Sequence, residues 1–358
     1  MIPILYENDE TGFDNNGICR LSDCISCVVT EERNGVYECD FEYPADGAYY
    51  EEIMPGRIIA CLHEESNNIQ PFDIVSYERN LNGITSFHAV HVSYRLSQMV
   101  VRGNISAFQA VDTLYKAISF LNANSGSADG FGFHVTTDMD NEEAHPSAFD
   151  GTPTSVKELM GGIEGSILDT FGGEWMFNKW TVTLLEARGE EKDFVVRYGL
   201  NMTGYDEETD FADTYATVIP YWKKEENGTV TVVYADTVDT GLTDYGDRKS
   251  CVPLDLSDKF QSQPTVAQLQ AKARKYIKAN RVNEPTQTIK VDFVRLENES
   301  GIELMQCKLC DTVRVVLPMY DLEKSFKIVK TAYNVLRERY DSMELGSKSL
   351  SLKEVMGL

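Results

Sequence analysis

The chain has 358 residues, of which 42% are hydrophobic and 25% charged, and its formal net charge is −24 at pH 7. This length exceeds one ordinary core, and the balance is that of globular proteins, so we expect two to four compact units rather than disorder. The acidity argues against a nucleic-acid binder, because phosphate neutralisation requires clustered Lys and Arg. Abundant Tyr (18) and Phe (16) favour a β-rich class.

The acidity is unevenly distributed along the chain. Residues 261–358 hold 16 Lys+Arg and 12 Asp+Glu, a net of +4, so subtraction from the totals (33 and 57) leaves residues 1–260 at 17 − 45 = −28. Solubility is the simplest reason for this excess. The N-terminus MIPILYENDE has neither the basic start nor the apolar stretch of a signal peptide, and no apolar run is long enough to cross a bilayer. We therefore expect synthesis in the cytoplasm and no membrane insertion.

The first hundred residues predict β structure. Asn34-Gly35 is typical of a hairpin turn, and after it Tyr37, Cys39, Phe41 and Tyr43 alternate with acidic residues. Further short strands are predicted at 57–62, 72–79 and 84–94, the last two joined by Asn82-Gly83. Short strands joined by tight turns indicate a small barrel or sandwich.

Residues 100–190 predict a mixed α/β unit inserted into this β structure. Ser106 and Ser155 each begin a capping box, and each precedes apolar residues at helical spacing. The predicted buried positions of the two helices are Phe108, Val111, Leu114, Tyr115 and Ile118, and then Val156, Leu159, Met160 and Ile163. Residues 174–177 and 180–185 predict a small hairpin.

Strands resume after the insert. Predicted strands cover 194–198, 213–222 and 229–234, and a helix covers 265–279 with Leu269, Ala273, Tyr276 and Ile277 on its buried face. Alternating segments follow at 286–296, 312–317 and 326–336, and residues 348–358 predict a frayed tail or an interface segment.

The cysteines and histidines do not indicate a metal centre. Two CxxC spacings occur, Cys24 with Cys27 and Cys307 with Cys310, but both pairs stand in strand-like sequence without knuckle glycines. We expect free, reduced thiols rather than zinc. His88 and His91 lie three apart in a predicted strand and therefore point to opposite faces.

Other catalytic patterns are missing from the sequence. There is no HExxH, GxSxG, GxGxxG or Walker pattern, and the acidic stretch 138–143 departs from a calcium loop because its sixth position is not Gly and its twelfth is Phe149. We assign no catalytic, cofactor-binding or metal residue. Two alternatives stay open: a cell-wall hydrolase within 122–190, and a saccharide-binding surface that uses Trp175, Trp180 or Trp222.

Several segments resemble one family in order and spacing. Leu21-Ser-Asp23, Glu31–Glu38 and Tyr43-Pro44 resemble the opening signature of phage minor structural proteins, the Tal-type or prophage endopeptidase tail proteins. The similarity continues at 53–59, 73–76, 197–202, 310–315, 327–330, 333–337 and 343–346. It spans most of the chain, with 122–150 and 235–262 unsupported.

The resemblance implies an α+β, β-rich, multidomain baseplate-hub-like fold with two β-barrel domains and inserted α/β domains. It implies a first barrel at 1–99, completed by a segment near 194–235, an α/β insert at 100–190, β segments shared between the barrels at 191–262, a helical segment at 263–284, a second barrel at 285–347 and a tail at 348–358. We expect no enzyme, because many relatives carry their activity on a long C-terminal extension and this chain stops at Leu358.

The functional expectation is a hub at the tail tip of a long non-contractile-tailed phage or prophage. Three copies would form a ring that adapts the sixfold tail tube to a threefold tip. The implied partners are two further copies, a distal tail protein hexamer, the tape measure protein and tail tube, and a separate receptor-binding protein. DNA would only pass through the channel, whose wall the acidic excess would keep from sticking to phosphates.

Overall fold

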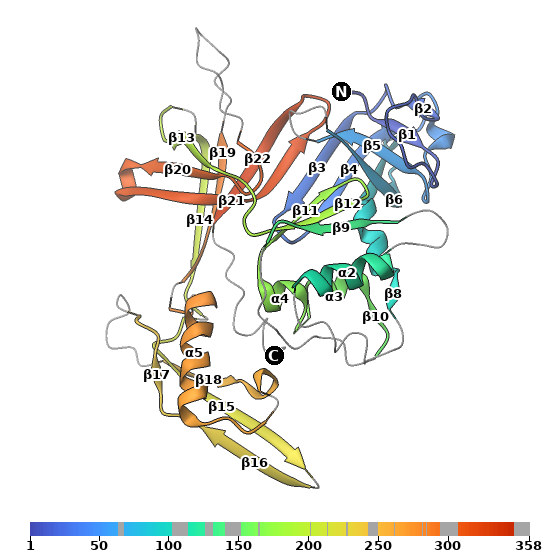
Figure 1. The fold of residues 1–358 in the computed structure, drawn as a ribbon. Coiled ribbons are helices and arrows are strands. Elements are labelled where there is room, and N and C mark those ends of the chain that lie inside the picture. The colour runs from blue at the N-terminus through green and yellow to red at the C-terminus, as the bar shows by residue number, and fades with distance from the viewer. Residues whose placement is uncertain are drawn as a thin grey trace. The chain divides into compact units, whose positions relative to one another are not determined.

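The computed structural model consists mainly of strands, as the alternating sequence pattern predicts (Figure 1). It describes residues 1–63, 68–101, 114–125, 132–139, 152–163, 165–200, 202–212, 214–226, 228–242, 250–260, 262–280, 282–283, 285–293 and 307–346. The chain divides into two compact units: unit 1 holds 1–205 and 290–345, and unit 2 holds 206–289 and 346–358. Among the described residues, no helix is both long and apolar enough to cross a membrane.

Unit 1 is built on a large sheet. Its strands are β1 (Ile4–Tyr6), β2 (Cys19–Arg20), β3 (Ser26–Glu32), β4 (Tyr37–Pro44), β5 (Ile58–Leu62), β6 (Ile69–Arg79), β7 (Ile84–His91), β13 (Glu191–Arg197), β14 (Met202–Asp210), β19 (Thr286–Phe293), β20 (Thr312–Leu317), β21 (Leu322–Asn334) and β22 (Arg339–Gly346). The hydrogen-bonded order is β14-β19-β22-β21-β3-β4-β7-β6-β5-β1-β2, and β20 joins β13 to β21. The chain leaves unit 1 within β14 and returns within β19.

β3 joins an early and a late part of the chain. It pairs with β4 on one side and with β21 on the other, in the register Thr331↔Glu31. The completion of a first barrel by a segment near 194–235 stays a prediction. A local alternating pattern shows that a strand exists but carries no information about its distant partner, because the ladder is formed by backbone groups common to all residues.

The first strands curl around a core. β4 has the alternating burial that its sequence predicts, with Tyr37, Cys39, Phe41 and Tyr43 buried. Residues of β3, β4, β5, β6 and β7 pack in one cluster, although β5 stands four places from β3 in the sheet order. The Met1 amine donates to the Val335 carbonyl oxygen (2.9 Å), which brings the start of the chain to the end of β21. No ladder between described strands closes this curl, so the two closed barrels stay a prediction.

An α/β layer lies between β7 and β13. It contains β8 (Val100–Val101), α2 (Leu114–Ser125), β9 (His134–Thr137), β10 (Thr154–Ser155), α3 (Val156–Met160), α4 (Ile167–Phe171), β11 (Glu174–Asn178) and β12 (Thr181–Leu185). β11 and β12 form the predicted hairpin, and β9 adds to β12 in parallel. The three helices lie on one side of this small sheet and share its core (Figure 1).

The helices of this layer confirm one capping box and correct two details. Ser155 accepts from the Glu158 amide and Glu158 accepts from the Ser155 amide, so the predicted capping box is present. The helix ends at Met160, before the predicted Ile163, because Gly161 is extended. Tyr115 is 77% exposed, because it lies about 100° around α2 from Leu114, at the edge of the buried stripe. The Ser106 capping box lies outside the described residues.

Unit 2 packs a helix against a sheet. Its sheet contains β15 (Thr217–Glu226), β16 (Thr229–Tyr234), β17 (Val238–Asp239) and β18 (Cys251–Asp255), with β15 paired to all three others. Helix α5 (Val266–Asn280) begins one residue after the predicted start, and Leu269, Ala273 and Ile277 are buried against the sheet as expected. Short 3-10 turns cover Tyr50–Glu52, Val92–Ser97, Ser257–Lys259 and Pro318–Tyr320.

Candidate functional site

An acidic groove lies on β3, β4, β6 and β7 of unit 1. It has a volume of about 550 Å³, and its lining includes Asp40, Glu42, Glu78 and His88. The carboxylates of Asp40 and Glu42 arise from period-two alternation in β4, which places them on the face opposite the buried aromatic residues, whereas Glu78 lies in the exposed end of β6. His88 Nδ1 lies 2.8 Å from Asp40 Oδ1, so the imidazole is engaged by a carboxylate. The groove therefore offers negative charge to a partner rather than a nucleophile paired with a base.

A buried carboxylate fastens the α/β layer to the large sheet. Glu174 Oε1 accepts from Arg33 Nη1 (3.2 Å) and from Lys327 Nζ (2.6 Å), while its Oε2 accepts from the Arg188 amide (2.6 Å). The Glu174 side chain is only 10% exposed. The carboxylate on β11 is thus contacted by Arg33, which lies 141 residues before Glu174, and by Lys327, which lies 153 residues after it. Such a pair holds register more than it adds net stability, because desolvation offsets much of the attraction.

Asn34 makes a second connection at the same place. Its side chain accepts from the Trp175 amide (2.8 Å) and donates to the Gly173 carbonyl oxygen (3.0 Å). Asn34 has φ = 55°, which Asn tolerates better than other side chains. The hairpin residue that the sequence identified only as a turn therefore also anchors the insert. Nothing local in the sequence signals this second role.

Polar side chains continue into the interior beside this connection. Arg188 donates to Glu31 Oε1 (2.9 Å), and Glu31 Oε2 lies 3.6 Å from His63 Nδ1. His63 Nδ1 in turn lies 2.8 Å from the Tyr37 hydroxyl. Glu31 and His63 are 5% and 3% exposed, so this chain of contacts is shielded from water.

The histidines 88 and 91 point to opposite faces, as predicted from their spacing. His91 is fully buried, where its Nδ1 accepts from the Ser93 amide and its Nε2 lies 3.2 Å from Gln70 Oε1. Burial lowers the pKa of His91 well below its ordinary value. A buried neutral imidazole with both nitrogens engaged is structural here. His145 lies outside the described residues.

The tryptophans offer little surface for stacking on sugars. Trp175 and Trp222 are 3% and 4% exposed. Trp180 is partly buried and donates from Nε1 to the Thr11 carbonyl oxygen (3.0 Å). Their packing agrees with the core interpretation of these residues.

Acids of the insert are engaged in local structure. Glu158 is the capping-box acid, and Asp169 Oδ2 accepts from the Gly165 amide (2.7 Å). Asp138 Oδ1 accepts from the Glu186 amide (3.3 Å), while 140–151, the rest of the calcium-like stretch, lies outside the described residues. None of these contacts pairs two carboxylates across an open site.

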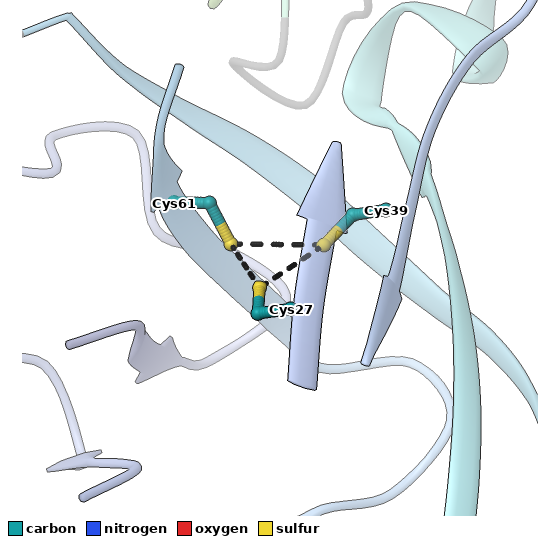
Figure 2. A group of neighbouring side chains, drawn as sticks. All are labelled: Cys27, Cys39 and Cys61. Atoms are coloured by element: carbon teal, nitrogen blue, oxygen red, sulfur yellow. Dashed lines mark hydrogen bonds between the residues drawn. The ribbon is translucent and has the colours of Figure 1, made fainter. Parts of the chain in front are cut away.

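The cysteines are arranged differently from the sequence expectation. Cys24 lies in the turn before β3 and Cys307 and Cys310 lie in the segment before β20, so only Cys27 of the two CxxC pairs stands within a strand. Cys27 instead meets Cys39 and Cys61, with 3.7 Å between each pair of sulfur atoms (Figure 2). Alternation signals the inward positions of Cys27 and Cys39, whereas β5 is buried at every position and gives no such signal for Cys61. All eight cysteines are free thiols.

Comparison with known proteins identifies the class of this fold. Over the whole chain, the fold matches the crystal structure of prophage tail protein gp18 from Listeria monocytogenes, with a TM-score of 0.64, 13% identity, and 100% and 98% of the two chains covered. A 43 kDa tail protein of prophage MuSo2 from Shewanella oneidensis matches with a TM-score of 0.62 and 11% identity, over 98% of this chain and 100% of that chain. A tail protein from Neisseria meningitidis matches with a TM-score of 0.58 and 13% identity, over 99% of this chain and 98% of that chain. At these identities the likeness establishes the fold.

A family model described as prophage endopeptidase tail matches residues 190–356, which is just under half of the chain. The resemblance to prophage tail-associated proteins is therefore confirmed, and so is the β-rich character of the fold. A comparison with curated proteins finds no match.

Proposed function

We propose that the chain is a structural subunit of the tail tip of a long-tailed phage or prophage. The observation that carries this proposal is a tail-protein fold over the full chain together with the family match over 190–356. Fold likeness alone is an analogy, because one fold can host several functions. The coincidence of the two makes a tail structural role the best supported one.

In the finer form of the proposal, three copies form a ring. Each copy contributes two barrels, one within 1–99 completed by a segment near 194–235 and one within 285–347, with the insert at 100–190 between them. Six barrels in three chains would match the sixfold tube and distal tail protein on one side and a threefold tip on the other. The tape measure protein and a separate receptor-binding protein complete the set of proposed partners.

Location on the particle tests the coarser part of this proposal. Antibodies against the chain, gold-labelled and viewed on intact particles, should mark the tail end distal to the capsid. Label along the tail shaft or on the capsid would contradict a tip subunit. Deletion of the gene should give particles without a functional tip, and the wild-type gene supplied in trans should restore them.

The acidic groove supplies a candidate for the wall of the DNA channel. A wall that repels phosphates lets DNA slide, and a basic wall would hold it. The triple variant Asp40→Lys, Glu42→Lys and Glu78→Lys should therefore slow DNA release from assembled particles. The matched control replaces the exposed acids Asp9, Asp14 and Asp46 by Lys and should leave release unchanged. Equal release in normally assembled particles of both kinds would remove the groove from the channel.

A hydrolase is the second candidate, because the matching family is described as an endopeptidase. The structural roles of Glu158, Asp169 and Glu174 favour scaffold over catalysis. Cell-wall zymography of the full chain decides between them. Clearing that disappears when acids of the insert are replaced, with the fold retained, would establish the hydrolase.

A further inference from the structure

Three cysteines converge in the interior of unit 1, away from the acidic groove. Cys27 comes from β3, Cys39 from β4 and Cys61 from β5, and each is 0% exposed (Figure 2). Cys27 and Cys39 are on neighbouring strands, whereas Cys61 reaches them across the core because the sheet curls. Three thiols from three strands thus point at one position.

The triangle of sulfur atoms has the size of a metal ligand set. Its sides are each 3.7 Å, so its centre lies 2.1 Å from every sulfur (3.7/√3). Zinc–sulfur bonds are about 2.3 Å, and a tetrahedron of such bonds has edges of about 3.8 Å. An ion about 0.8 Å out of the sulfur plane would satisfy all three bonds without movement of the strands. Thiols in van der Waals contact have a similar spacing, so the triangle alone does not distinguish a metal site from packed thiols. A fourth ligand is needed to complete the tetrahedral set.

Cys24 is the nearest further thiol along the sequence, three residues before Cys27 in a turn, and it is only partly buried. Its sulfur lies outside the group of three that are within 4.8 Å of one another, so the turn has to move for Cys24 to become the fourth ligand. Its thiol now donates to the Ser26 carbonyl oxygen (3.1 Å), a weak bond that a metal bond would replace. A C-x₂-C pair with one ligand in a turn is the spacing found in structural zinc sites.

We propose that Cys27, Cys39 and Cys61, completed by Cys24, bind one thiophilic metal ion, with Zn²⁺ as the occupant. Soft thiolates in a tetrahedral set select zinc over harder cations. Binding releases four protons, one from each thiol, and forms four Zn–S bonds. The ion would fasten β3, β4 and β5 and the turn at Cys24 from within. This site goes beyond the proposed tail function and does not depend on it.

Binding at this site should depend on pH. Thiolates are the zinc ligands, so the metal displaces protons from the thiols, and the apparent affinity should rise as the pH rises.

The test begins with the metal content of the full chain. The protein is purified reduced and without chelators, titrated with Zn²⁺ or Co²⁺, dialysed and analysed by mass spectrometry of the elements. We expect one zinc per chain, and with cobalt the strong absorption bands of a tetrahedral thiolate site. Zinc well below one per chain, with no such bands, would overturn the proposal.

Variants locate the ion. Cys39→Ala should lose the metal, and Cys24→Ala should keep it with at least tenfold lower affinity. The controls are Cys307→Ala, which removes a buried thiol outside the cluster, and Cys251→Ala, which removes an exposed one; both should keep one zinc. Circular dichroism verifies the fold of each variant. A chelator should lower the melting temperature of the wild type but not that of Cys39→Ala. Zinc retained by a folded Cys39→Ala protein would refute the assignment.

Discussion

The carboxylate of Glu174 provides the sharpest test of how the α/β layer is attached to the sheet of unit 1. Glu174→Gln keeps the size of the side chain and removes its charge. Arg33 and Lys327 then lose their shared anionic partner, and the Arg188 amide loses a charged acceptor. Because these groups come from the β3–β4 hairpin, from β21 and from the segment between β12 and β13, the substitution weakens three connections at once.

The expected magnitude follows from burial. Removing one partner from a buried ion pair costs about 3–5 kcal/mol. Arg33 and Lys327 are 20% and 23% exposed and so can regain some water, while Gln retains one acceptor oxygen. We therefore expect the free energy of unfolding of unit 1 to fall by about 2–3 kcal/mol.

Urea unfolding followed by tryptophan emission measures this loss. Trp175 adjoins Glu174 and is buried in unit 1, whereas Trp222 belongs to unit 2, so a Trp222→Phe background isolates the signal of unit 1. The matched control is Glu190→Gln, which breaks the exposed pair with Lys192 (2.7 Å) and should leave the midpoint unchanged. If Glu174→Gln and Glu190→Gln unfolded at the same urea concentration as the parent, the buried pair would have no anchoring role.

Three further predictions test other parts of the structure. Burial lowers the pKa of His91, so the unfolded chain binds the proton more readily than the folded one. The contribution of His91 to the free energy of unfolding should be constant above about pH 6.5 and fall by up to about 1.4 kcal/mol per pH unit below it. His91→Gln should remove this part of the pH dependence, as measured by melting at several pH values. Gly189→Ala should lower the free energy of unfolding by more than about 3 kcal/mol, because φ is +76° and a Cβ would meet the Cys310 backbone at 2.3 Å. The control Gly199→Ala has φ = +80° but open space around the Cβ, and should cost about 1 kcal/mol. Equal losses would show that the close approach of Gly189 to Cys310 does not matter for stability. Ser155→Ala should cost about 1 kcal/mol through loss of the capping box, as measured by chemical unfolding, and an unchanged midpoint would mean that α3 does not depend on its cap.

Local features of the fold could be predicted from the sequence. Alternation located β4, β16 and β20, and helical spacing located α5, because these patterns follow from the geometry of a single segment. The pairing of β3 with β21 could not be predicted, because 298 or more residues separate partners such as Val29 and Tyr333 and backbone ladders carry no residue code.

The cysteine cluster and the contacts of Glu174 could not be predicted from the sequence, for a related reason. The CxxC spacing drew attention to Cys24 and Cys27 as a pair, while Cys27 meets Cys39 on the neighbouring strand and Cys61 on a strand that only the curl of the sheet brings near. The same holds for Glu174, which is one acid among many until the fold surrounds it with cations. A site formed across a core depends on distant register, and a single sequence does not specify that register.

The mass of the assembled protein tests the central claim most directly. Multi-angle light scattering would be recorded for the chain alone and mixed with the distal tail protein from the same gene cluster, since weak subunit contacts can require a partner ring. The account predicts a trimer in at least one of the two conditions. A strict monomer in both, with no association between the proteins, would contradict a ring-forming subunit of the tail tip.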